Sequence, residues 1–77
     1  MPTIARLSGA VIRMYADDHP PPHFHLVGAK SDAMIRLDTL DMLRGVADRR
    51  DLAEAVAWAR SNLGVLEMEW TRLNERG

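Results

Sequence analysis

The stretch AVIRMYADDHPPPHFHLVGAKSDAMIRL, residues 10–37, contains three segments with the composition of β-strands, separated by two turns. Residues 10–16 are rich in β-branched and aromatic side chains, and residues 23–27 and 32–37 alternate polar with apolar side chains. Prolines at 20–22 remove backbone donors and hold φ at about −65°, so the first strand must end before them. Residues 28–31 supply the second turn. This order predicts a three-stranded antiparallel meander.

The second half of the chain has the pattern of a helix. Residues 40–43 form a short amphipathic stretch, which we expect to add at most a fourth strand at the sheet edge. Asp48 is a good N-cap, and a helix is predicted from there to about Asn74. Its apolar side chains recur in steps of four and three and form one stripe. The stripe consists of Leu52, Val56, Ala59, Leu63, Leu66, Trp70 and Leu73. Gly64 predicts a bend or a split in this helix.

These elements predict an α+β fold in which residues 1–77 form a single domain. One face of the sheet would carry Ile12, Met14, Phe24 and Leu26 and needs a cover, which the helical stripe can provide. The same stripe has a heptad-like spacing that would also suit a coiled-coil dimer. The sequence is therefore also compatible with a homo-oligomer.

Composition excludes several classes of function. The chain has 77 residues, no Cys, and ten Lys plus Arg against eleven Asp plus Glu, for a net charge of −1. Such a balance gives no bulk attraction to nucleic acid or membrane. No run of about 18 apolar residues and no secretory signal is present, so we expect a cytoplasmic protein without a membrane span. A core of this size rarely supplies more than about 3–5 kcal/mol, so a metal or a second subunit would help.

All three histidines, His19, His23 and His25, fall within seven residues beside Asp17 and Asp18. Side chains two apart on a strand project from the same face, so His23 and His25 could share one ligand. Neutral imidazole binds Zn, Cu or Ni, and the third ligand could be His19 or one of the two aspartates. The alternative is that the histidines bond to backbone or carboxylate and that the aspartates shape the turn.

The same strand pattern predicts a polar, locally cationic sheet face. It would consist of Arg13, Tyr15, His19, His23, His25 and Arg36. We expect this face to bind a small protein partner, and an RNA contact is a weaker alternative. A metal-free ribonuclease is a further alternative, with His23 or His25 as the general base and Arg13 holding the phosphate.

The opening Met1-Pro2-Thr3-Ile4, the segment Ile12-Arg13-Met14-Tyr15 and the run Asp18-His19-Pro20-Pro21-Pro22-His23-Phe24-His25 resemble a family of short bacterial proteins whose domain has no assigned function. The resemblance covers nearly the whole chain and extends to Arg49-Arg50, Trp58 and Trp70. It implies a stand-alone small protein, often encoded beside another short protein in a toxin–antitoxin-like pair. It implies no catalytic residue.

Overall fold

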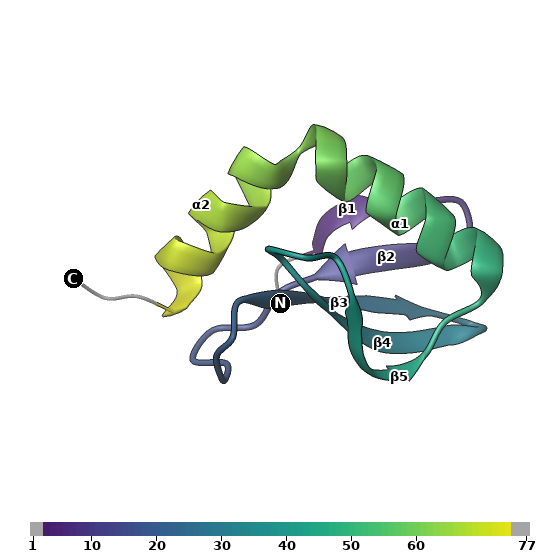
Figure 1. Ribbon diagram of the computed structural model, residues 1–77, viewed down its shortest axis with the longest axis horizontal. Coiled ribbons are helices and arrows are strands. Elements are labelled where there is room, and N and C mark those ends of the chain that lie inside the picture. The colour runs from purple at the N-terminus through teal and green to yellow at the C-terminus, as the bar shows by residue number, and fades with distance from the viewer. Residues whose placement is uncertain (1–2, 75–77) are drawn as a thin grey trace.

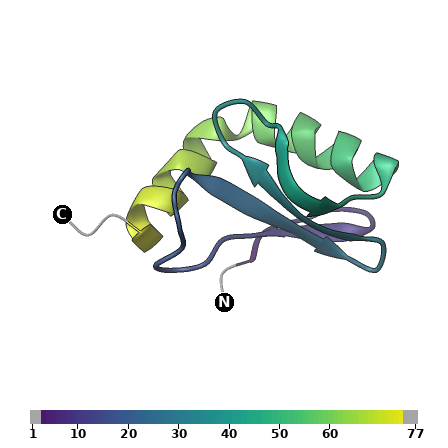
Figure 2. The ribbon, with the colours of Figure 1, turned by 60° about the horizontal axis from the view of Figure 1, so that its bottom comes forward.

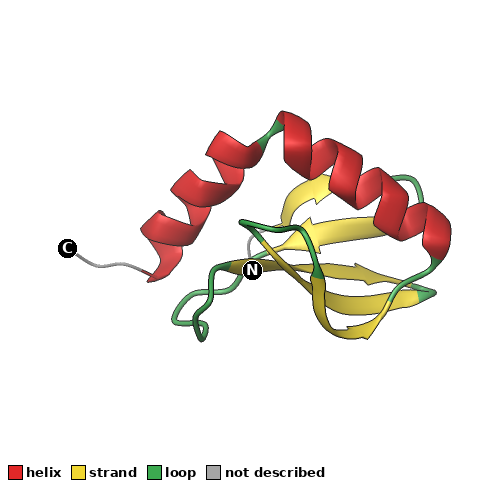
Figure 3. Cartoon of the chain, in the orientation of Figure 1, coloured by secondary structure: helices red, strands yellow, loops and turns green. Residues whose placement is uncertain are grey.

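The structure is a computed structural model in which residues 3–74 are described; Met1 and Pro2 of the N-terminal motif lie outside them. An antiparallel sheet is followed by two helices, so the predicted α+β class is confirmed (Figures 1 and 3). The elements are β1 (Thr3–Arg6), β2 (Ala10–Arg13), β3 (His23–Gly28), β4 (Ser31–Arg36), β5 (Met42–Val46), α1 (Arg49–Ser61) and α2 (Leu63–Asn74). Each strand pairs with its neighbour in sequence, as predicted for a meander.

The described residues form five strands, so the prediction of three or four is wrong in number. The missed strand is β1, which pairs with β2 through Ala5 opposite Ile12 and Arg6 opposite Val11. Its four residues carry no clear alternation, and cross-strand pairing rather than local propensity holds it in place. The strand predicted over residues 10–16 is β2, which is shorter than predicted and ends at Arg13.

The strand predicted at residues 40–43 corresponds to β5. It lies at the sheet edge, as predicted, but covers Met42–Val46. It continues through Gly45, beyond the predicted stretch of residues 40–43. Gly45 has φ of 94° and its Cα lies so close to Asp32 that a Cβ there would collide with the Asp32 carbonyl oxygen. Glycine is therefore required for this strand to approach β4.

The helical half begins as predicted and divides slightly earlier than predicted. The Asp48 side chain accepts a hydrogen bond from the Arg50 backbone N–H at 3.1 Å, which is the expected N-cap. The division falls at Asn62, whose backbone N–H donates to Ala59 and whose side-chain amide donates to the Trp58 carbonyl. Gly64 lies inside the first turn of α2. The split is thus a C-cap at Asn62, and Gly64 does not form it.

Helix α1 lies over one face of the sheet, and α2 extends past the end of the sheet toward the loop between β2 and β3 (Figures 1 and 2). The inner face of the sheet buries Ile12, Phe24, Leu26 and Ile35 completely. Ala59, Leu66 and Trp70 of the predicted stripe are buried against this core, together with Ala55. Val56 and Leu63 are only half-buried. Neither helix in the described residues has the length and apolarity of a membrane span.

Candidate metal centre

The loop between β2 and β3, residues 14–22, positions the candidate site. Its beginning is tied to α2, because the Asp17 N–H donates to the Leu73 carbonyl and the Asp18 N–H donates to the Asn74 side-chain oxygen. Its end is tied to the chain after β4, because the Leu37 N–H donates to the Pro22 carbonyl at 3.0 Å. These bonds hold the carboxylate of Asp18 over the start of β3.

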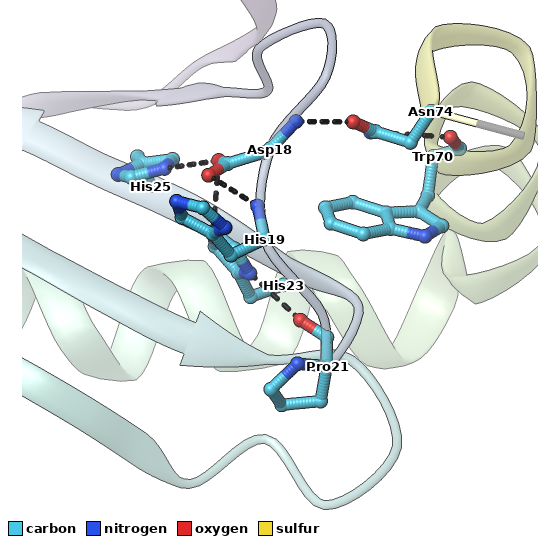
Figure 4. A network of polar contacts seen from close by, with 7 residues as sticks. All are labelled: Asp18, His19, Pro21, His23, His25, Trp70 and Asn74. Carbon is cyan, nitrogen blue, oxygen red and sulfur yellow. Dashed lines mark hydrogen bonds and ion pairs between the residues drawn. The ribbon is translucent and has the colours of Figure 1, made fainter.

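Asp18 receives both histidines of β3 on a single oxygen atom (Figure 4). Its Oδ2 lies 2.9 Å from His23 Nε2 and 3.0 Å from His25 Nε2. Its Oδ1 accepts the His19 backbone N–H at 2.9 Å. The ligand atoms of Asp18, His23 and His25 all lie within 4.8 Å of one another. Two imidazole nitrogens and one carboxylate oxygen therefore converge at one point.

The hydrogen bond of His23 Nδ1 determines whether His23 Nε2 carries a hydrogen. Nδ1 lies 2.8 Å from the Pro21 carbonyl oxygen, which can only accept a hydrogen bond, so Nδ1 carries a hydrogen. In the neutral ring Nε2 then has a bare lone pair facing a carboxylate oxygen. Such a pair is favourable only when a cation lies between the two atoms, which is either a proton on Nε2 or a metal ion.

Aromatic rings pack around the two imidazoles. The Tyr15 ring meets the His25 ring edge-on with centroids 4.6 Å apart, and the His23 and His25 rings lie 5.0 Å apart. On the other side the Trp70 indole contacts His23 with centroids 5.2 Å apart. The His23 side chain is fully buried, whereas the His25 and Asp18 side chains are each 19% exposed. The site is thus open to solvent at His25 and Asp18.

The pKa of Asp18 lies below its ordinary value. Burial on its own would raise the pKa, but the hydrogen bond from His25, the His19 N–H and the positive potential of His23 and His25 together lower it. The carboxylate is therefore held in its charged form, which is the form that binds a cation.

The register places the predicted face residues as expected. Arg13 on β2 lies directly opposite His25, and Arg36 on β4 lies directly opposite His23, so these four side chains share the face away from the helices. Arg36 Nε lies 2.6 Å from Asp38 Oδ1 as an ion pair. The predicted polar face is not exposed at His23, because Trp70 and the proline loop cover that ring.

Two of the candidate ligands lie outside the group. His19 is exposed and contributes its backbone N–H rather than its ring to Asp18. Asp17 is also exposed and adopts a left-handed turn conformation with φ of 58°. Of the two aspartates that the sequence left open, Asp18 joins the histidines and Asp17 does not.

Sequence reasoning missed three supporting groups: the Pro21 carbonyl, Trp70 as a wall against His23, and Asn74. Trp70 was predicted only as a core residue of the helical stripe. Asn74 gave no signal, because a polar residue near a helix end is ordinary. Trp70 and Asn74 reach the site only through the docking of α2 on the loop.

No curated protein and no solved structure matches the chain. A family model described as a domain of unknown function, DUF4160, matches residues 9–71, which include every strand but β1, all of α1 and most of α2. The metal-centre candidates Asp18, His23 and His25 all fall within the matched part. The chain therefore belongs to the DUF4160 family, whose members share a domain of unknown function.

Proposed function

We propose that this protein binds a divalent transition metal, Zn, Cu or Ni, through Asp18 Oδ2, His23 Nε2 and His25 Nε2. The observation that carries the proposal is the convergence of these three atoms within 4.8 Å, with the Nε2 of His23 bared toward the carboxylate by the bond from Nδ1 to Pro21. A backbone carbonyl on the far nitrogen is how metal-binding histidines are commonly oriented.

The distances from Asp18 Oδ2 to the two nitrogens support this reading. A tetrahedral ion with bonds of about 2.0–2.1 Å holds its ligand atoms about 3.3–3.4 Å apart. Asp18 Oδ2 lies 2.9 Å and 3.0 Å from the two nitrogens and would move away from each by a few tenths of an ångström. The two imidazole nitrogens, which lie within 4.8 Å of each other, would move closer together as they bind the ion. Three protein ligands then leave one position for water or another ligand, on the side where His25 and Asp18 reach solvent.

The competing account is that Asp18 only fastens the loop to β3 through protonated histidines. The two accounts differ in what a metal does to the protein. If Asp18 only holds the loop to β3, the protein needs no metal and should bind one weakly. If the three side chains form a metal site, metal affinity depends on all of them and metal binding releases protons.

Calorimetric titration of the tag-free protein with Zn, Cu and Ni tests the proposal. We expect one ion per chain, with the affinity reduced at least about tenfold by His25→Ala and by Asp18→Asn. His23 is left intact because it is buried against Trp70 and its removal would leave a cavity. His19→Ala is the matched control, since it removes an exposed imidazole from the same loop and should leave the affinity unchanged. No binding, or equal loss in the control, would contradict the proposal.

We also propose, as a second candidate, the small protein partner that the sequence predicts. The observation that favours it is the edge strand β5, all of whose residues are exposed, including Met42, Leu43 and Val46. An edge strand offers unpaired backbone groups to a strand of another chain, and a lysine there discourages such pairing. Binding of a short partner protein encoded beside this one should weaken in Val46→Lys if β5 is the surface, and in His25→Ala if the histidine face is. Partner binding that is unchanged in both variants would exclude both β5 and the histidine face as the partner-binding surface.

A further inference from the structure

The face around His25 carries arginines on both sides, and this arrangement deepens the proposed metal function. Across the sheet, Arg13 on β2, His25 on β3, Met34 on β4 and Arg44 on β5 are successive cross-strand partners. Cross-strand partners share a face and their Cβ atoms lie about 4.5–5.5 Å apart. Arg13 is therefore the direct neighbour of His25 on one side, and Arg44 lies two strands away on the other side.

A hollow in the surface adjoins His25 on the Arg44 side. It is lined by His25, Asp32, Ala33, Met34, Arg44 and Gly45. The glycine matters here, because β5 approaches β4 closely at Gly45 and leaves no side chain in that place. The hollow gives a small ligand room beside the imidazole.

Arg13 supplies an independent sign of a missing ligand. Its Nε atom is buried and makes no hydrogen bond within residues 3–74. Arg36 Nε is buried in the same way, but a carboxylate oxygen of Asp38 lies 2.6 Å from it. A buried N–H without a partner is uncommon, because such a donor loses its hydrogen bonds to water and gains none in return. Since Arg13 lies directly opposite His25, an anion seated at the open side of the metal would lie within the reach of this guanidinium group.

Charge selects the class of anion. A bound divalent metal carries two positive charges, which exceed the single negative charge of Asp18. Arg13 and Arg44 add two further positive charges, and Asp32 is the acidic residue among those that line the hollow. A doubly charged tetrahedral oxyanion suits this field better than a carboxylate does, and guanidinium forks match its oxygen atoms. We propose that the metal-loaded centre binds the phosphate group of its ligand, between the open position at His25 and the side chains of Arg13 and Arg44. This inference rests on the proposed metal binding.

Protein loaded with Co²⁺ tests the inference, because the visible absorption of Co²⁺ responds to its ligands. Inorganic phosphate should change this spectrum saturably, and Arg13→Gln and Arg44→Gln should each weaken phosphate binding about tenfold, the loss expected of a charge-assisted hydrogen bond. Neither variant removes a metal ligand, so neither should weaken metal binding. Arg60→Gln, on α1 across the sheet, is the control and should change neither.

The outcomes separate the inference from the function it rests on. Failure to take up Co²⁺, together with no binding of Zn, Cu or Ni in the calorimetric titration, would overturn both. Uptake of Co²⁺ with no spectral response to phosphate, or a response that both arginine variants retain in full, would overturn the phosphate site alone. A short single-stranded RNA that competes with phosphate and depends on the same arginines would identify a nucleic acid backbone as the source of the phosphate. Competition by a mononucleotide but not by RNA would identify a small phosphorylated ligand.

Discussion

The indole of Trp70 lies against the imidazole of His23 with ring centroids 5.2 Å apart, which joins the second helix to the candidate metal centre. One turn further along α2, Asn74 accepts the N–H of Asp18, and its own side-chain amide donates to the Trp70 carbonyl. The position of the carboxylate therefore depends on the docking of α2 as well as on the proline loop.

Asn74→Ala should weaken the site without removing a ligand. The lost hydrogen bond to the Asp18 N–H should lower the free energy of unfolding by about 1 kcal/mol. Because the carboxylate is then less firmly held, metal affinity should also fall. Urea unfolding and metal titration measure the two effects. Thr71→Ala, an exposed change on the same helix, should show neither. Unchanged metal affinity in Asn74→Ala would mean that the loop alone positions Asp18.

Acid should remove the contribution of Asp18 to stability. Its pKa in the folded protein lies below the value of 3.8 that the free side chain has, because of the bonds from His25 and His19. A carboxylate with a lowered folded-state pKa stabilises the fold above its unfolded pKa and loses that contribution as the pH falls through the folded one. In the absence of metal, the free energies of unfolding of the unaltered protein and Asp18→Asn should therefore converge as the pH is lowered. A difference that stays constant with pH would contradict the assigned interactions.

Two glycines should respond oppositely to alanine. Gly64 lies in α2 with open space where a Cβ would stand, so Gly64→Ala should raise the free energy of unfolding by about 0.5–1 kcal/mol. Gly45 has positive φ and contacts the Asp32 carbonyl, so Gly45→Ala should lower it by more than about 1 kcal/mol. Urea unfolding of the pair distinguishes them. A destabilised Gly64→Ala protein would show that the helix division needs this glycine.

Ser31→Ala should loosen the start of α1. Ser31 Oγ donates to Asp51 Oδ2 at 2.6 Å and accepts the Asp48 N–H at 3.0 Å, and both Ser31 and Asp51 are buried. Removing the hydroxyl leaves buried polar groups without this partner, which costs about 1–3 kcal/mol. Amide hydrogen exchange should accelerate at the N-terminal turn of α1 before it does in β3. Uniform acceleration throughout the chain would point to a global effect instead.

The parts of the fold that the sequence predicted well are those set by local pattern. The strands of residues 23–28 and 31–36, the Asp48 cap and the apolar stripe depend on alternation, capping and helical spacing. The strand β1 and the full length of β5 depend on pairing with a neighbour, and Gly45 is needed for close approach rather than for a turn. Local pattern does not contain that information.

In the candidate site, too, the sequence predicted the features that local pattern sets and missed those that depend on contacts between distant segments. The alternation of residues 23–25 predicts that His23 and His25 share a face, and the register agrees. The choice of Asp18 over Asp17, the burial of His23 and the contribution of Asn74 follow from how the loop meets α2, which is a contact between segments some fifty residues apart. Spacing along the chain could not distinguish the two aspartates.

The most direct test of the central claim is a nuclear magnetic resonance titration that observes the histidine ring nitrogens of the tag-free protein as Zn is added. The account predicts that Nε2 of His23 and Nε2 of His25 shift on binding, that the hydrogen on His23 Nδ1 persists, and that both nitrogens of His19 stay unchanged. Ring signals that do not respond to Zn, or a His19 response equal to that of His25, would contradict a metal centre built from Asp18, His23 and His25.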